Sequence, residues 1–158
     1  MQQHYYNIPD PSNLPSMIQS DFDEIVSKHQ RYLKGQKLGA RAVIQYHNLS
    51  GLDFKCADLS QADFTGSSLV NCTLSHCLFV STSFFACDMR NAKMIETNLA
   101  RADLRGAYLA GADLSRSNMH DADMREGKIM KKDSNGALST RKRSGGGAGS
   151  NTILTGAK

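Results

Sequence analysis

The chain has 158 residues, a formal net charge of +4 and 40% hydrophobic residues, which suits one domain with terminal extensions. No apolar run approaches the ~18 residues of a membrane-spanning helix. The first ten residues lack the basic and apolar regions of a secretory signal. The four cysteines are therefore expected to be reduced thiols of a cytoplasmic protein. The positive charge raises the question of nucleic-acid binding.

The first 41 residues divide into a leader and a helix. Residues 1–15 contain three prolines and are expected to form a flexible leader. Residues 16–41 are expected to form a helical cap, with Ser20 and Asp23 as an N-cap pair and Gly35 near the C-cap. One face of this helix is apolar, and its members are Ile18, Phe22, Ile25, Val26, His29, Tyr32 and Leu33.

Residues 42–131 repeat with a period of five. The 18 positions at five-residue steps from Ile44 to Ile129 are all large and apolar, and the residue two before each is nearly always small. The residue between these two is often acidic or an amide, at Asn48, Asp53, Asp58, Asp63, Asp88, Asn98, Asp103, Asp113, Asn118 and Asp123.

A five-residue period fits neither a helix, at 3.6 residues, nor a strand, at two. It fits a chain that turns a corner every five residues and sends one large and one small side chain inward. Because one unit cannot bury its large residue alone, the units must stack.

Blocks such as ADLSQ-ADFTG and ADLRG-AYLAG-ADLSR resemble the A(D/N)LXX units of the pentapeptide-repeat family. The resemblance implies an all-β solenoid, a right-handed quadrilateral β-helix with four pentapeptides per coil, here with an N-terminal capping α-helix. The segment HQRYLKGQKLGARA, which leads into the repeats, resembles proteobacterial members of the family that have a helical N-terminal cap.

With four pentapeptides per coil, residue i stacks on residue i+20. The expected inward columns are Leu49/Leu69/Met89/Leu109/Ile129, Phe54/Leu74/Met94/Leu114, Leu59/Phe79/Leu99/Met119 and Phe64/Phe84/Leu104/Met124. The methionines are interpreted as gap-filling core residues.

Residues 132–158 are expected to form a flexible, basic, Gly/Ser-rich tail. Within it, TILTG followed by AK resembles a pentapeptide unit restarting around Leu154. The tail could therefore begin a second repeat block that a truncated chain lacks.

No set of residues indicates catalysis, a cofactor or a metal. The recurring Ser and Asp residues follow from the repeat, and no phosphate-binding loop is present. Cys72, Cys77 and Cys87 occupy small inward positions. Cys56, His76, Glu96 and Arg116 share one outward column, in which a zinc site would need further ligands, and Glu96 with Arg116 is interpreted as a surface ion pair.

Several outward positions near the second coil are apolar where polar residues are usual. They form a candidate protein-interaction patch, unless part of it packs under the N-terminal segment, and they are Val70, Leu78, Val80, Phe85 and Ile95. Leu78 and Val80 are expected to share one face, with Phe85 on the next.

The basic excess lies outside the repeats. Residues 44–129 contain ten acidic and eight basic residues, whereas residues 130–158 contain one acidic and six basic residues. A candidate polyanion contact is therefore Lys131, Lys132, Arg141, Lys142 and Arg143. Such short basic runs are more often solvated tails, so nucleic acid is not expected as the main partner.

These features predict a non-enzymatic protein-interaction scaffold of unknown partner, with a homodimer as one option. The alternative is a DNA-mimicking, or nucleic-acid- or topoisomerase-directed, module, because the family includes acidic rods that occupy gyrase. The nearly neutral repeat region disfavours this alternative. In it, Arg105 and Arg125 stand beside Asp103 and Asp123 of the acidic column that begins at Asp63.

Overall fold

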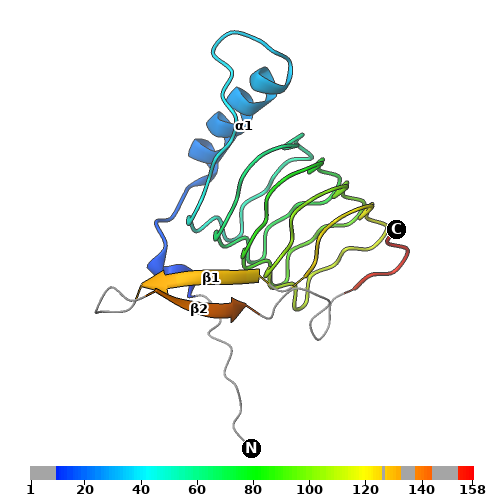
Figure 1. Ribbon diagram of the computed structural model, residues 1–158. Coiled ribbons are helices and arrows are strands. Elements are labelled where there is room, and N and C mark those ends of the chain that lie inside the picture. The colour runs from blue at the N-terminus through cyan, green and yellow to red at the C-terminus, as the bar shows by residue number, and fades with distance from the viewer. Residues whose placement is uncertain (1–9, 126, 133–137, 144–152) are drawn as a thin grey trace, which may run out of the picture.

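The computed structural model describes residues 10–125, 127–132, 138–143 and 153–158 (Figure 1). Its regular elements are η1 (Pro11–Asn13), α1 (Gln19–Leu33), β1 (Gly127–Lys132) and β2 (Leu138–Arg143). Between α1 and β1 the chain winds as a stack of coils, with α1 near one end and residues 153–158 at the other (Figure 1). No helix in the described residues is long and apolar enough to cross a membrane.

Parallel β-bridges join each pentapeptide to the fourth one after it and define four faces of the stack. Face A contains Val43, Asp63, Ser83, Asp103 and Asp123, and face B contains Asn48, Ser68, Asp88 and Tyr108. Face C contains Asp53, Thr73, Lys93, Asp113 and Ile153, and face D contains Asp58, Leu78, Asn98 and Asn118. These contacts are single bridges rather than extended strands, because a turn interrupts the backbone every five residues.

The corners between faces are tight turns. At the corner from Leu49 to Leu52, the Leu52 N–H donates to the Leu49 carbonyl at 3.1 Å, and Gly51 has φ of +76°. A positive φ at the third residue is the signature of a type II turn, which favours glycine. Many equivalent corners nevertheless hold a non-glycine residue, such as Asn71 at +58° and Ser81 at +57°.

The recurring Asp and Asn residues each close a local hydrogen bond. The Asp53 carboxylate accepts the Lys55 N–H at 2.8 Å, and the Asp58 carboxylate accepts the Ser60 N–H at 3.0 Å. All ten Asp and Asn positions of the repeat make this contact with the N–H two residues later. An acceptor on a short side chain suits this geometry, which explains why the repeat requires Asp or Asn there.

Large inward residues form a continuous core along the stack. Phe64 and Phe84, predicted to be vertical neighbours, have stacked rings with centroids 5.5 Å apart. The small inward column adds hydrogen bonds to this packing. The Cys72 thiol donates to the Leu49 carbonyl at 3.0 Å, and the Thr82 hydroxyl donates to the Leu59 carbonyl at 2.9 Å. The polar groups of these two residues are therefore satisfied by the coil before them.

Helix α1 covers the first coil, as predicted from its apolar face. Phe22 is buried, and its ring centroid lies 4.4 Å from that of Phe54. The predicted N-cap at Ser20 is wrong, because α1 already begins at Gln19, after Ile18. Asp23 instead accepts hydrogen bonds from the Gln19 amide and the Lys55 ammonium group.

The early start of α1 follows from how the preceding residues are held. The Asn48 N–H donates to the Pro15 carbonyl at 2.9 Å, and the Met17 N–H donates to the Asn48 carbonyl at 3.0 Å. Residues 15–17 thus continue face B above the first coil, so this end of the expected flexible leader is paired. The leader residues 1–9 lie outside the described residues.

His29 joins α1 to the coils through two backbone groups. Its Nδ1 accepts the Ala42 N–H at 2.9 Å, and its Nε2 lies 2.9 Å from the Ser60 carbonyl oxygen. Because Nδ1 accepts, the proton belongs on Nε2, which donates to Ser60. Burial lowers the pKa of this fully buried imidazole, which favours the neutral form that the two contacts require.

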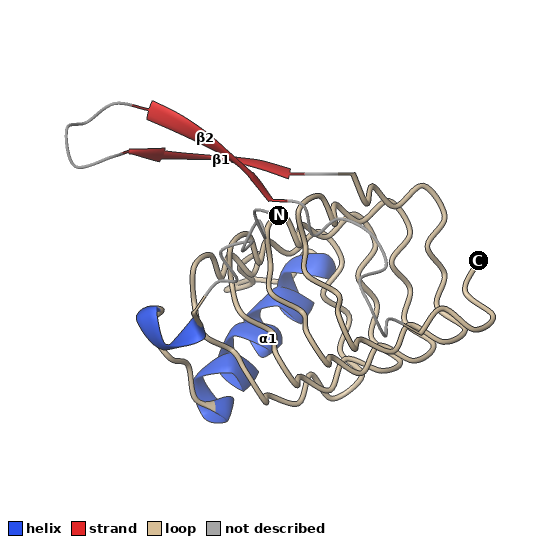
Figure 2. Ribbon diagram, turned by 90° about the horizontal axis from the view of Figure 1, so that it is seen from below, coloured by secondary structure: helices blue, strands red, loops and turns tan. Residues whose placement is uncertain are grey.

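The C-terminal part differs from the predicted tail. Strands β1 and β2 form an antiparallel hairpin, which lies beside the stack rather than within it (Figure 2). Ile129 pairs with Arg141 in this hairpin, so its predicted place beneath Leu109 in the inward column is wrong. Pairing with β2 competes with stacking on the coil, and the Asn135–Gly136 dipeptide between the strands is typical of hairpin connections.

The repeat resumes after the hairpin. Ile153 pairs with Asp113, and the Leu114 N–H donates to the Ile153 carbonyl at 2.8 Å. The predicted unit around Leu154 is therefore part of the stack. Ile153 takes the place below Asp113 that Asp133 would hold in an uninterrupted stack, so the hairpin and its connections add one coil length to the chain.

We predict that acid weakens the cap through His29. The unfolded imidazole, with a pKa near the ordinary ~6.5, takes up a proton that the folded one, with its lowered pKa, resists. Stability should therefore fall as the pH drops below about 6.5. Thermal unfolding between pH 7.5 and 5 should show this fall in the wild type and a smaller fall in His29→Gln. Equal pH dependence of the two proteins would contradict the role of His29.

We also predict that residues 133–152 can be deleted without loss of the fold. The deletion joins Lys132 to Ile153 and restores the five-residue phase, so that residues 127–131 can stack on face B. One cooperative transition, at a temperature no lower than that of the wild type, should be seen by circular dichroism. Deleting 134–151 is the control, because it shifts the phase by two residues and should loosen residues 153–158. If the control is equally stable, register does not govern this end.

Candidate functional surfaces

The register of the coils distributes the five outward apolar residues over all four faces. Leu78 and Val80 lie on face D, as predicted, and Phe85 lies on face A. Val70 follows the face B bridge at Ser68, and Ile95 follows the face C bridge at Lys93. The five residues therefore do not form one patch. Leu78, with 41% of its surface exposed, and the half-buried Val80 are the pair that the fold brings together.

Phe85 is covered in part by a cation. The Arg105 guanidinium carbon lies 5.4 Å from the centroid of the Phe85 ring, one coil below it on face A. This contact is within the range of a cation–π interaction. Phe85 is therefore half-buried by its own neighbours, and it offers less apolar surface than its sequence position suggests.

Arginines pair with the last two aspartates, Asp103 and Asp123, of the acidic column on face A. The Arg105 Nε and Nη2 atoms donate to both oxygens of Asp103, at 2.9 and 2.8 Å, and Arg125 binds Asp123 in the same way, at 2.9 and 2.7 Å. Arg105 also lies 3.8 Å from Asp123, so the charges form a ladder. These contacts lower the pKa of Asp123 to about 2, chiefly through the hydrogen bonds from Arg125.

A third pair of this kind lies on face B, and sequence reasoning missed it. Asp88 is buried, and both of its oxygens accept hydrogen bonds from Arg90, at 2.8 and 2.6 Å. The signal in the sequence is the spacing Asp-x-Arg across one large inward residue, which recurs at 103–105 and 123–125. Forked pairing is the strongest geometry for these two groups.

In the corner column of Cys56, His76, Glu96 and Arg116, the last three residues make polar contacts through the Glu96 carboxylate. Arg116 donates to Glu96 at 2.7 and 2.8 Å, and His76 Nδ1 lies 3.3 Å from the same carboxylate. The predicted Glu96–Arg116 ion pair is therefore present. Within the described residues, no group of three or more His, Cys, Asp or Glu side chains is arranged to hold a metal ion.

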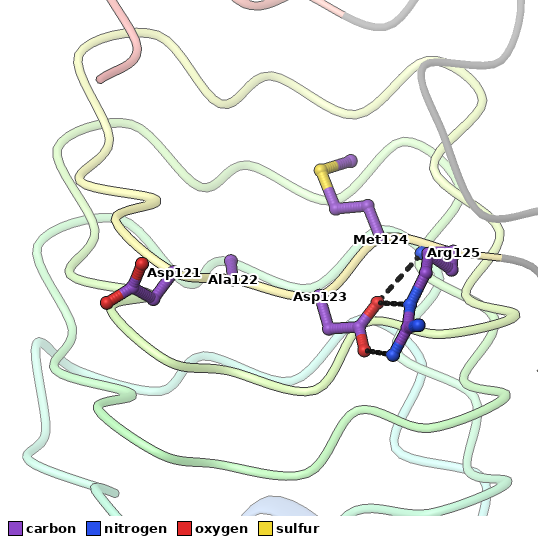
Figure 3. Close-up of a pocket in the computed structure, with 5 residues that line it drawn as sticks. All are labelled: Asp121, Ala122, Asp123, Met124 and Arg125. Atoms are coloured by element: carbon purple, nitrogen blue, oxygen red, sulfur yellow. Dashed lines mark hydrogen bonds and ion pairs between the residues drawn. The ribbon is translucent and has the colours of Figure 1, made fainter.

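A shallow depression lies at the last coil and is lined by Asp121, Ala122, Asp123, Met124 and Arg125 (Figure 3). Its Asp123 carboxylate is engaged by Arg125, as the dashed contacts in Figure 3 show. A carboxylate with this pairing and a pKa of about 2 stays ionised at neutral pH. It is therefore poorly suited to exchanging protons with a substrate.

Two of the inward thiols, those of Cys72 and Cys77, are fully buried. Burial raises the pKa of Cys72 and of Cys77 to about 12. The thiolate, which is the nucleophilic form, is therefore scarce at neutral pH. These cysteines serve as small core residues that donate hydrogen bonds, and Cys56 is the exposed one.

The five residues of the predicted polyanion contact lie in the hairpin. Lys131 and Lys132 end β1, and Arg141, Lys142 and Arg143 end β2. The register pairs Gly127 with Arg143 and Lys128 with Lys142. These five candidate residues therefore lie in paired strands rather than in the expected flexible tail.

The family model for pentapeptide repeats matches residues 48–80 and 87–125, in eight copies. The chain belongs to the pentapeptide-repeat family. The matched ranges lie within the coils, and the gap between them begins directly after Val80 and contains Phe85. No curated protein shows significant similarity to this pentapeptide-repeat protein.

Several solved structures are similar to it. One is a pentapeptide-repeat protein of the Arabidopsis thaliana thylakoid lumen, 24% identical over 72% of this chain and 60% of that one, with a TM-score of 0.48. A second is Rfr23 from the cyanobacterium Cyanothece 51142, 21% identical over 71% and 63%, with a TM-score of 0.34. The plasmid-mediated fluoroquinolone-resistance protein QnrB1 is 14% identical over 75% and 53%, with a TM-score of 0.40.

The chain thus spans 60% and 63% of the first two structures. All three TM-scores are below 0.5.

The stability of the fold should depend more on the Asp88–Arg90 pair, whose carboxylate is buried, than on the solvent-accessible Asp123–Arg125 pair. Arg90→Met leaves the buried Asp88 carboxylate without its partner, and we expect it to lower the free energy of unfolding by about 2 kcal/mol or more. Arg125→Met is the control, because Asp123 and Arg125 are solvent-accessible and their pairing should contribute little. Urea unfolding of both variants measures the difference, and equal losses would contradict the importance of burial.

Proposed function

We propose that this pentapeptide-repeat protein is a non-enzymatic protein-interaction scaffold that makes contact through face D. The observation that carries the proposal is the exposed Leu78 beside the half-buried Val80, at positions where the coils above and below hold polar or small residues. Asp58 and Ser60 stand above the pair, and Asn98 and Ala100 stand below it. Adjacent apolar residues that reach the surface of an otherwise polar face are typical of interaction surfaces.

Local hydrogen bonding supports a role for Leu78 outside the fold. At equivalent positions the Asp or Asn side chain accepts the N–H two residues later, which leucine cannot do. The Val80 N–H is instead bound by the Ser60 hydroxyl at 3.3 Å. Leu78 therefore gives up a contact that every Asp and Asn of the repeat makes, and it gains little burial in return.

The absence of enzyme activity is part of the proposal. Support comes from the arginine-paired Asp123 in the depression at the last coil and from the raised pKa values of Cys72 and Cys77. No residue described above combines exposure, a partner base and an enclosed cavity, which catalysis by a side chain requires.

The proposal also includes the type of β-helix that the coils form and the cellular location of the protein. We infer that the coil is the right-handed quadrilateral β-helix of the pentapeptide-repeat family, because bridges along four faces join each unit to the fourth one after it. We also propose a cytoplasmic location, in keeping with four free cysteines.

The double variant Leu78→Asn/Val80→Ser tests the contact surface. It restores the polar pattern of the neighbouring coils, so we expect an unchanged or slightly higher unfolding temperature. Self-association, measured by light scattering over a range of concentrations, or capture of a cellular protein by the tagged chain should be lost. The matched control is Asn98→Asp/Ala100→Ser, one coil below on the same face, which should retain both.

Two results would contradict the proposal. A clear drop in the unfolding temperature of the Leu78/Val80 variant would make the pair structural. A monomeric wild type whose captured proteins are unchanged in that variant would remove face D as the contact surface.

A further inference from the structure

The hairpin concentrates positive charge that the coils lack. Its twelve strand residues include six basic and no acidic ones, at Lys128, Lys131, Lys132, Arg141, Lys142 and Arg143. Coil residues 42–125 instead contain nine acidic and seven basic residues, and several of these form the ion pairs described above. The charge of the hairpin is therefore distinct from that of the scaffold.

The strand register places like charges together. Lys128 stands directly opposite Lys142, and like charges at opposed positions destabilise a two-stranded ribbon. No acidic residue lies in either strand to offset this repulsion. An external polyanion would relieve it, which makes the arrangement understandable as a binding element rather than as a stabilising one.

The register also decides which class of polyanion fits. The three large apolar residues of the strands, Ile129, Met130 and Leu138, stand opposite Arg141, Thr140 and Lys132, respectively. Each apolar residue is thus paired in register with a polar or charged one, and no row of alternate residues in either strand is apolar throughout, as entry into a lipid surface would require. The pairing therefore favours a hydrophilic polyanion over a membrane.

The dimensions of the hairpin suit duplex DNA. Six residues per strand make a ribbon roughly 20 Å long, and the major groove of B-form DNA, ~12 Å wide, admits a two-stranded β-ribbon. The hairpin lies beside the stack (Figure 2), where it does not interrupt the register of the coils. A ligand could therefore be bound there without disturbing the scaffold.

We propose that the β1–β2 hairpin of this protein binds double-stranded DNA, with the ribbon in the major groove and its six basic residues supplying the positive charge that attracts the phosphates. This activity is independent of face D. A pairing of the strands before binding reduces the ordering cost that a flexible basic tail would carry. The hairpin thus adds a nucleic-acid contact to a scaffold whose own surface is nearly neutral.

The experiment measures binding of the full chain to a fluorescent 20-base-pair duplex by anisotropy between 50 and 200 mM salt. If all six cations meet phosphates, the affinity should fall on the order of 10³-fold over this range. Arg141→Gln/Arg143→Gln should weaken binding roughly 10- to 100-fold at 50 mM salt and make the salt slope shallower by about 2. Lys93→Gln/Arg101→Gln is the matched control, which removes two exposed charges from the coils and should bind as the wild type does.

The variant that lacks residues 133–152 should lose binding while keeping the coil spectrum by circular dichroism. If this deletion variant does not fold, the comparison of Arg141→Gln/Arg143→Gln with its coil control tests the proposal instead. The Leu78→Asn/Val80→Ser protein should bind DNA normally, which separates this proposal from that of face D. The proposal is overturned by no duplex binding at 50 mM salt or by equal losses in the hairpin variant and its coil control. Tighter binding to the single strand, or binding only to vesicles containing phosphatidylserine, would also overturn it.

Discussion

Stacking of each pentapeptide on the fourth one after it is the constraint on which the rest of the structure depends. A single five-residue unit buries almost nothing, and its large residue becomes part of a core only when the coils above and below supply neighbours. The ring stack of Phe64 on Phe84 and the backbone bond from Leu49 to Ser68 are two expressions of the same register. Every surface column, whether charged, apolar or polar, is fixed by it as well.

The same stacking holds corners that are unfavourable in isolation. Non-glycine residues such as Asn71, Ser81 and Arg101 adopt positive φ, which costs L-residues about 1–2 kcal/mol each. Their backbone N–H groups donate to the next coil, as from Asn71 to the Arg90 carbonyl at 3.1 Å and from Ser81 to the Ala100 carbonyl at 2.9 Å. The ladder therefore maintains corner conformations that the local sequence does not favour, and this rigidity suits a scaffold.

The sequence was sufficient for whatever follows from the period, and it was insufficient where two structures compete for the same residues. The core columns, the position of α1 over the first coil and the return of the repeat at Leu154 were all predictable. Ile129 was not, because Gly127–Lys131 matches the repeat while the structure pairs this segment with β2. The Ser20 N-cap failed for a related reason, since contacts of Pro15 and Met17 with Asn48, distant in sequence, set the start of the helix.

On the candidate surfaces, the period likewise determines the face on which a residue lies, but it does not determine the contacts of its side chain. The face of each outward apolar residue was calculable, and the spread of Val70, Phe85 and Ile95 around the stack follows from it. The cover that Arg105 gives Phe85, and the burial of the Asp88–Arg90 pair, depend on side-chain directions that spacing alone does not fix. A register of four units per coil also tolerates an insertion of one full coil length, because the next unit then meets the same face. The β1–β2 hairpin and its connections form such an insertion, which takes the unit around Ile129 out of face B, and the repeat resumes on face C at Ile153. The fold can therefore add a charged appendage while the coil units before and after it keep their register.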